Sequence, residues 1–511
     1  MKEPKVLLIY PPIQFLSQES PRPDGSLGLL YLAGALEKAG IQVDVIDAVL
    51  GPPEEDLQDT FYNRVLQPNG LIRIGMSFER IHECIAKGAY NIVGINSNFT
   101  PQTRMALDVA RITKEVDPDI LVVVGGVNAR NLPRRFLESG CVDIIVNTEG
   151  EQIIVKVVQS WSRGFNPDEL DGVTYINNGR PISIPPKPDS VAVHLDELPF
   201  PLWSKLPLGK YARVSGPHGD LTSIKDIPYA PIMTSRGCPF QCAYCHISVE
   251  KDDPQSTGGI GALRFKSVDR VLEEIRILRA LGVKRLYFED DSLLAKKARV
   301  KALFGEVKIY GLSIADVNGI NLVHFQIKNR VTGKLETDRD YLEVLKDAGF
   351  DNIVFPVESG SQRILDTYAT AKLNVETMDL VHLVKTACDV GITCPINMMI
   401  GFPDETEEEI MQTVELAKRL VDAGAGYCAF FIPTPFPGSQ LYNSAVRDGY
   451  LDPNVDPDTL NIHRVAMTNT AVAPERLMEL REWAWRTVNR KEYVEARLKL
   501  SVGSRWDPAT P

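Results

Sequence analysis

Long apolar runs, basic clusters and internal repeats are all missing from this chain of 511 residues. No window approaches the roughly 18–20 uninterrupted apolar residues of a transmembrane helix, so we expect no membrane span. The formal net charge is −11 and is spread along the chain. We therefore expect no nucleic-acid partner, because phosphate contacts need clustered lysine and arginine. The length predicts about two to four domains of ordinary globular composition.

A signal peptide is also not evident, since residues 1–5 lead into a short strand-like run without a small-residue cleavage site. We therefore expect a cytoplasmic location, where structural disulfides are rare. Cysteine is scarce, at eight residues in the whole chain. Five of these cysteines are scattered and, mostly in apolar context, are expected to be buried thiols; they are Cys84, Cys141, Cys388, Cys394 and Cys428.

The other three cysteines, Cys238, Cys242 and Cys245, follow an apolar run with C-x3-C-x2-C spacing. Three thiolates on one tight loop can bind three irons of a [4Fe–4S] cluster and leave the fourth iron open to a substrate or cosubstrate. His246 makes a Cys3His zinc site conceivable, although adjacent residues of a tight loop seldom converge on one tetrahedral ion. A disulfide would require an oxidising compartment.

The first 160 residues alternate short apolar runs with amphipathic stretches. The run from Leu27 to Gly40 predicts a helix that ends at a glycine. The apolar runs predict five strands, at residues 6–10, 43–47, 89–96, 120–124 and 143–147. This alternation favours an α/β fold with a parallel, doubly wound, Rossmann-like sheet over residues 1–160. Such sheets bind ligands at the carboxyl ends of their strands.

Turn-forming residues follow those strand ends and are the candidate ligand contacts. Glycine there lets the backbone approach a ligand closely, although each turn taken alone also fits ordinary strand-to-helix turn chemistry. Gly125 and Gly126 do not form the G-x-G-x-x-G pattern of dinucleotide sites. The candidates are Pro11, Pro12, Ser97, Gly125, Gly126, Glu149 and Gly150.

The remainder of the chain predicts three further segments. Dense prolines predict a stiff linker over residues 161–225. Residues 226–440 predict an incomplete (β/α)6 version of the TIM barrel, with a helix from Val268 to Ala280 and strands at 232–235, 285–289, 322–327, 352–357, 394–400 and 427–432. Residues 441–511 predict a helical segment, with a long helical stretch from Pro474 to Leu500, that packs on the barrel or covers its open side.

The cysteine spacing, with the aromatic Tyr244 before the third cysteine, resembles the radical S-adenosylmethionine (radical SAM) superfamily. The resemblance implies that SAM chelates the open iron and is cleaved to a 5′-deoxyadenosyl radical, which abstracts a hydrogen atom. It assigns Tyr244, Asp290, Glu358 and Ser359 to SAM binding. Asp290 also fits an acidic helix cap, and Glu358-Ser359 also fits a capped helix start.

The N-terminal pattern resembles the cobalamin-binding domain that precedes the barrel in one radical SAM subclass. The matching elements are Tyr10-Pro-Pro, Leu27-Gly28-Leu29, Val124-Gly-Gly and Glu149-Gly-Glu. The D-x-H-x-x-G motif of other cobalamin domains is missing, because Val49 stands where the histidine would be. The subclass typically holds cobalamin without a histidine on cobalt. The resemblance assigns the seven turn residues above to cobalamin.

The resemblance implies a C-methyltransferase acting on a small molecule through methylcobalamin, supplied with electrons by a flavodoxin or ferredoxin. An oxidative cyclase or rearrangement enzyme with the same cofactors is the first alternative. A non-catalytic cobalamin sensor is the second, and the intact cysteine triplet opposes it. A methylthiotransferase would need a second N-terminal cysteine triplet, where only Cys84 and Cys141 lie.

Overall fold

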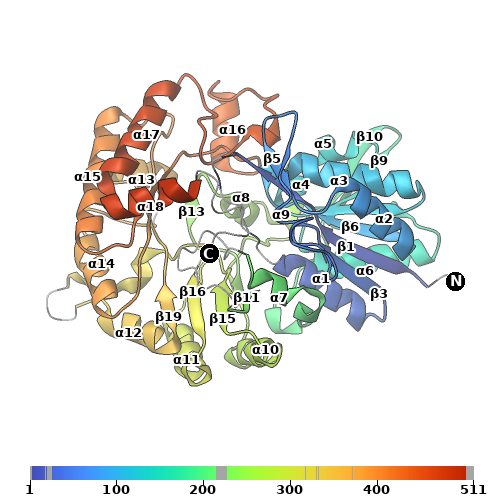
Figure 1. Cartoon of the computed structure of the whole chain (residues 1–511), viewed down its shortest axis with the longest axis horizontal. Coiled ribbons are helices and arrows are strands. Elements are labelled where there is room, and N and C mark those ends of the chain that lie inside the picture. The colour runs from blue at the N-terminus through green and yellow to red at the C-terminus, as the bar shows by residue number, and fades with distance from the viewer. Residues whose placement is uncertain are drawn as a thin grey trace.

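The fold is described from a computed structural model, which covers residues 3–17, 19, 23, 26–214, 227–316, 318–329, 331, 333–370 and 372–501. Two α/β units lie side by side, the N-terminal sheet at the right of Figure 1 and the barrel at the left. Residues 215–226, at the end of the expected linker and the start of the expected barrel, lie outside the described residues, as do residues 502–511 of the C-terminal segment.

The N-terminal sheet has the strand order β10-β9-β8-β7-β6-β1-β3. Its five parallel strands follow a 2-1-3-4-5 order, which is typical of flavodoxin-like doubly wound sheets. Their bounds are β1 (Lys5–Tyr10), β3 (Gln42–Asp47), β6 (Ile92–Asn96), β7 (Leu121–Gly125) and β8 (Ile144–Val146). The prediction of five strands in a parallel sheet is therefore confirmed. Their mainly apolar side chains on both faces need a cover of helices.

Helices cover both faces of this sheet. Helices α1 (Leu27–Lys38) and α6 (Gly150–Ser162) pack on one face, and α2 (Phe78–Gly88) and α3 (Thr103–Val116) pack on the other. The short helices α4 (Val127–Asn131) and α5 (Pro133–Leu137) follow β7. Helix α1 ends as predicted, with Gly40 just beyond it at φ 74°. A small antiparallel sheet of β2 (Ile13–Phe15), β5 (Ile72–Ile74) and β4 (Val65–Leu66) lies beside these elements.

The proline-rich segment expected to be connective contains regular structure. Strands β9 (Val173–Asn177) and β10 (Arg180–Ile184) form a hairpin that pairs antiparallel with β8 and extends the sheet. The chain then runs through short turns and α7 (Leu208–Tyr211) toward the barrel.

The second unit is a barrel of six parallel strand positions. Its strands are β11 (Tyr229–Ile232), β15 (Arg285–Phe288), β16 (Ser313–Asp316), the interrupted pair β19 (Phe350–Asn352) and β20 (Phe355–Glu358), β22 (Ile396–Met399) and β23 (Cys428–Phe431). They pair in chain order, and a bridge from Asn352 to Thr393 joins the two parts. The predicted partial (β/α)6 barrel is confirmed.

One predicted barrel strand is wrong. Residues 322–327 were expected to form the third strand, but Leu322–Phe325 form a 3-10 turn, η8, that Asn321 caps through its side chain. The third strand is β16 instead, where Ile314 and Ala315 are buried between β15 and β19. A short apolar run fits either a buried strand or a buried turn, so periodicity could not separate them.

Helices surround the barrel, and short strands flank its loops. The helices are α10 (Val268–Ala280), α11 (Lys297–Val307), α12 (Arg339–Ala348), α13 (Gln362–Tyr368), α14 (Leu380–Asp389) and α15 (Glu407–Asp422). The loops contain α8 (His246–Asp252), α9 (Pro254–Thr257) and the antiparallel pairs β12 (Ser235–Arg236) with β14 (Arg264–Phe265), β13 (Gln241–Cys242) with β21 (Ala369–Thr370), and β17 (Gln326–Lys328) with β18 (Leu335–Thr337). Helix α10 has the predicted bounds, and Ser267 caps it.

The C-terminal segment packs on the barrel. Helix α16 (Gln440–Arg447) is followed by α17 (Pro474–Val488) and α18 (Lys491–Ser501), which replace the single long helix predicted there. Asn489 breaks that helix, because its side chain bonds both the N–H and the C=O of Cys428 at the start of β23. Helix α17 lies along α15 (Figure 1).

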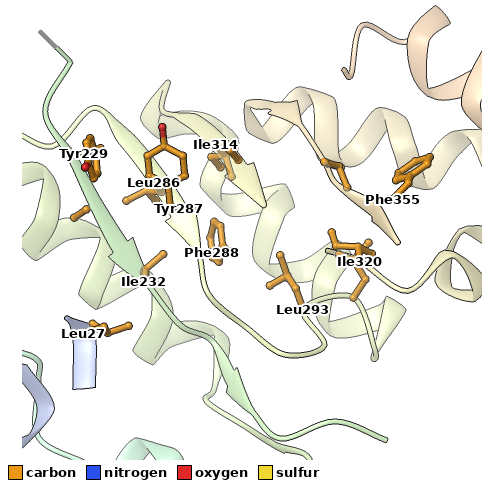
Figure 2. Close-up of a cluster of buried hydrophobic side chains, with 14 of the residues drawn as sticks. Leu27, Tyr229, Ile232, Leu286, Tyr287, Phe288, Leu293, Ile314, Ile320 and Phe355 are labelled. Carbon is orange, nitrogen blue, oxygen red and sulfur yellow. The ribbon is translucent and has the colours of Figure 1, made fainter. Parts of the chain in front are cut away.

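One hydrophobic core runs through both units. Figure 2 shows part of this core, in which Leu27 of α1 belongs to the same cluster of buried side chains as Ile232 of β11, Phe288 and Phe355. Apolar packing therefore joins the sheet domain to the barrel, in addition to the polar contacts described below. Among the described residues, no helix is long and apolar enough to cross a membrane.

Candidate cofactor cavity

A cavity of about 600 Å³ lies between the two units. Its N-terminal wall comes from the start of α1 and the carboxyl ends of β1, β6, β7 and β8. Its other wall comes from the cysteine loop and the loops that follow β15 and β23. Both α/β units thus turn their ligand-binding edges toward one space. The residues that line the cavity include Gly28, Gly126, Arg236, Tyr244, Glu289 and Asp291.

The cysteine loop borders this cavity. Cys238 follows β12, Cys242 ends β13, and Cys245 is the cap residue of α8. Gly237, just before the first cysteine, has φ 82°, and a Cβ there would lie 2.4 Å from the carbonyl oxygen of Ala262. The loop therefore needs glycine at this position. Hydrogen bonds fix the loop backbone; the Ser248 hydroxyl, for example, donates to the Cys242 carbonyl at 2.9 Å.

The donor chemistry of this loop fits an iron–sulfur cluster better than zinc. Burial raises the pKa of all three thiols, that of Cys245 to about 12, so metal charge is needed to bind them as thiolates. His246 points to Glu250, with Nδ1 2.9 Å from Oε1. In the part of the chain that the structure describes, no three His, Cys, Asp or Glu side chains converge on a single-ion site. A cubane differs, since each cysteine binds its own iron.

The acidic segment after β15 is divided between the barrel interior and the cavity. Asp290, the residue predicted to contact SAM, is buried and accepts hydrogen bonds from the Thr234 N–H and the Ser235 hydroxyl. Glu289 and Asp291, its neighbours, line the cavity instead. Alternation along an extended chain produces this division. Of this acidic segment, Glu289 and Asp291 are therefore the carboxylates that line the cavity.

The end of the fourth barrel strand is strained and charged. Glu358 is buried with φ 69°, a left-handed conformation that non-glycine residues adopt at a cost of about 1–3 kcal/mol. Its carboxylate forms an ion pair with Lys372. Ser359 is fully buried, and its hydroxyl accepts from the Ser361 N–H at 3.1 Å, while Ser361 is the residue that caps α13. Ser359 does not line the cavity, whereas Tyr244 does.

The ends of β1 and β6 place their predicted residues behind the cavity wall. Pro11 and Pro12 are buried, and Tyr10 lines the cavity in their place. Ser97 is buried under Asn128, whose side-chain amide donates to its hydroxyl at 2.9 Å. These residues shape the turns without facing the space between the units.

The ends of β7 and β8 do face the cavity. Gly126 has φ 117°, and a Cβ there would lie 2.4 Å from Asn98 Oδ1. A Cβ added to Gly28 at the start of α1, another lining residue, would meet nothing within 4 Å, so this glycine leaves room. Gly125 and Gly150 also line the cavity. A wall of glycines at strand ends suits a large planar ligand such as a corrin, because backbone can lie close to its face.

Ion pairs cross the junction next to these glycines. Arg236 of the barrel reaches Glu151 at 2.5 Å and Glu149 at 3.3 Å, and Arg264 reaches Glu149 at 2.5 Å. Burial raises the pKa of Glu149, but Arg236 and Arg264 outweigh that effect, so its pKa is lowered. Glu149, predicted to bind a cofactor, is thus a partner in these junction ion pairs.

Sequence reasoning missed several charged residues of this region. Arg130 of α4 pairs with Glu250 of α8, and both line the cavity with His246. Arg236 could have been noticed from its position two residues before Cys238. Lys372 gave no signal, because a lysine in a loop pairs with Glu358 at the end of β20 only through the fold, and no local spacing indicates that contact.

Comparisons with known proteins agree with this architecture. The family model for the radical SAM superfamily matches residues 232–417, and that for the B12 binding domain matches residues 25–158. An uncharacterized methyltransferase of Pyrococcus horikoshii is 30% identical over 88% of this chain and 85% of its own. The cytidylyl-2-hydroxyethylphosphonate methyltransferase of Streptomyces wedmorensis is 26% identical over 88% and 83%.

Two further similarities extend the comparison. The radical SAM methyltransferase TsrM from Kitasatospora setae, solved with cobalamin and a [4Fe–4S] cluster, shares the fold with a TM-score of 0.62 at 17% identity, over 88% of this chain and 75% of its own. The anaerobic magnesium-protoporphyrin IX monomethyl ester cyclase of Rubrivivax gelatinosus is 26% identical over 81% of this chain and 64% of its own.

The chain belongs to the radical SAM superfamily, in the group whose barrel is preceded by a B12-binding domain. It is therefore a radical SAM enzyme. Its cofactors are a [4Fe–4S] cluster, S-adenosylmethionine and cobalamin.

Proposed function

We propose that this enzyme methylates an unactivated carbon of a small molecule. The observation that carries the proposal is the shared cavity, into which the cysteine loop and the glycine-lined sheet edge both open. When bound, SAM at the cluster supplies a hydrogen-abstracting radical and cobalamin supplies the methyl group. A carbon radical has to meet its methyl donor at near-contact distance, so both cofactors need access to one substrate.

The residues of this chain would divide the work as follows. Cys238, Cys242 and Cys245 would hold the cluster, and Asp291 with Glu289 would accept hydrogen bonds from the ammonium group of SAM. The glycine wall would seat cobalamin with Val49, buried and apolar, where other cobalamin domains have a histidine. The junction ion pairs would keep the two units together and restrict water, which protects a radical from side reactions.

The test is an anaerobic turnover assay with SAM that carries a deuterated methyl group, a chemical reductant and candidate small molecules. We expect 5′-deoxyadenosine and S-adenosylhomocysteine in comparable amounts and a product heavier by one labelled methyl group. The variant with all three loop cysteines changed to alanine should lose its iron, its sulfur-to-iron absorbance and all 5′-deoxyadenosine formation. Normal iron content in that variant would refute the assignment of the cluster.

A second function has one observation in its favour, the similarity to a cyclase. The same assay separates the two. Substrate loss with 5′-deoxyadenosine but without S-adenosylhomocysteine would indicate oxidative cyclisation or rearrangement. We also propose that a flavodoxin or ferredoxin supplies the electron, and replacing the chemical reductant with either protein tests this directly.

A further inference from the structure

A buried lysine lies against the cysteine loop although it is distant in sequence. Strand β21 pairs with β13 so that Ala369 lies opposite Cys242, and the Ala243 N–H donates to the Tyr368 carbonyl at 2.8 Å. This short ladder carries the chain from α13 across the loop and brings Lys372 to it.

The Lys372 ammonium has one anionic partner and one aromatic neighbour. It pairs with the Glu358 carboxylate, and the two side chains are only 13% and 8% exposed. Its Nζ also lies 6.0 Å from the centroid of the Tyr244 ring. Burial lowers the pKa of Lys372, but the charge and hydrogen bond of Glu358 together with the neighbouring Cys242 and Cys245 outweigh that effect, so the pKa of Lys372 is raised.

The charge of Lys372 reaches the cluster cysteines. Ala369, shortly before Lys372 in the chain, pairs with Cys242, and Tyr244, whose ring lies near the ammonium, stands between Cys242 and Cys245 in the loop. Three thiolates make a bound cluster a net anion, and an added electron increases that negative charge. A second anion buried nearby, such as Glu358 alone, would oppose reduction because Coulomb repulsion is strong at low dielectric.

We propose that Lys372 is a positioning residue for the radical chemistry, which fixes Glu358 toward the SAM site and cancels its charge beside the cluster. The strained backbone of Glu358 fits this role, since a left-handed residue persists only where its surroundings hold it. The proposal rests on the cofactors of the proposed function but not on methyl transfer itself.

The test compares Lys372→Met, Lys372→Arg, Glu358→Gln and the double variant Lys372→Met/Glu358→Gln with the wild type. The midpoint potential of the cluster is measured by a redox titration followed by electron paramagnetic resonance, without substrate or cobalamin. Iron content and SAM affinity are measured on the same samples. Lys308→Met, at an exposed position on the barrel, is the matched control.

We expect Lys372→Met to lower the midpoint potential and to weaken SAM binding tenfold or more. The double variant should recover the potential, because the charge balance returns, but not the SAM affinity, because Glu358 is gone. Lys372→Arg should retain both properties, and Lys308→Met should change neither. This pattern separates an electrostatic and positioning role from a merely structural one.

Two results would overturn the proposal. One is a wild-type potential in Lys372→Met at full iron content, and the other is a double variant whose potential stays as low as that of the single variant. If Lys372→Met binds little iron, the Glu358→Gln variant provides the test instead. Removing the Glu358 anion should raise the midpoint potential of the cluster, and an unchanged or lower potential would refute the role proposed for Lys372. A failure of methyl transfer would leave these potentials unaffected, so the two proposals fail separately.

Discussion

The ion pairs at the domain junction allow one prediction to be worked out in energy. Arg236 is 15% exposed and bridges Glu149 and Glu151, which are 12% and 6% exposed. In the variant Arg236→Met, Glu149 keeps Arg264, but Glu151 loses its cation while it stays buried. Leaving a buried charge unpaired costs about 3–5 kcal/mol, and we expect the free energy of unfolding to fall by that amount.

The partner variant Glu151→Gln should cost much less. Arg236 still pairs with Glu149, and the glutamine carbonyl can still accept from the arginine, so the loss is about 1 kcal/mol. The asymmetry of at least ~2 kcal/mol identifies an unpaired buried anion as the cause, because a loss of packing or of one hydrogen bond would not produce it.

The assay is urea unfolding, followed by tryptophan fluorescence and by far-ultraviolet circular dichroism. Coincident transitions are required, because a two-domain protein can unfold in steps, and equal slopes with urea show that the same surface is exposed. The control is Arg134→Met at an exposed pair, where the side chain is 75% exposed, which should stay within about 0.5 kcal/mol of wild type. If Arg236→Met and Glu151→Gln agree within about 1 kcal/mol, the reasoning is wrong.

Three further predictions follow from single sites. Gly28→Leu should fill the cavity and weaken cobalamin binding at least tenfold with little change in Tm. The control Gly305→Leu changes another helix glycine with no atom within 4 Å of an added Cβ and should bind cobalamin normally. Equal cobalamin binding by the two variants would contradict the assignment of Gly28 to the cobalamin wall. Asp290→Ala should destabilise the fold by about 2–4 kcal/mol, because buried donors lose their acceptor, yet change SAM affinity less than threefold by calorimetry; a tenfold loss would return Asp290 to the SAM site. The hydrogen bond from Cys394, with the two sulfur atoms 3.8 Å apart, lowers the pKa of Cys388 to about 7. The rate of Cys388 alkylation should therefore rise with pH with its midpoint at about 7. A midpoint near pH 9 would show that the hydrogen bond is not formed in solution.

Local patterns were enough for much of the fold. Helix α10 was predicted at its observed bounds, because Ser267 caps an amphipathic run. The third barrel strand was misplaced, because a four-residue strand leaves almost no period to read and the apolar run at Leu322 resembles one equally well. The C-terminal helix was predicted unbroken, because the bond that breaks it joins Asn489 to Cys428, 61 residues earlier.

What the sequence alone determined is the chemistry. Cys238, Cys242 and Cys245 lie within one loop, so their spacing by itself predicts a cluster with an open iron, and Val49 by itself excludes a histidine ligand in the usual place. Only the tertiary structure decided which neighbouring carboxylates face the cavity, that Glu149 pairs across the junction, and that Lys372 lies beside the cysteine loop. The physical reason is the sequence separation of the residues involved. A local motif fixes its own geometry, whereas charge pairs and cavity walls depend on contacts between segments that lie apart in the sequence.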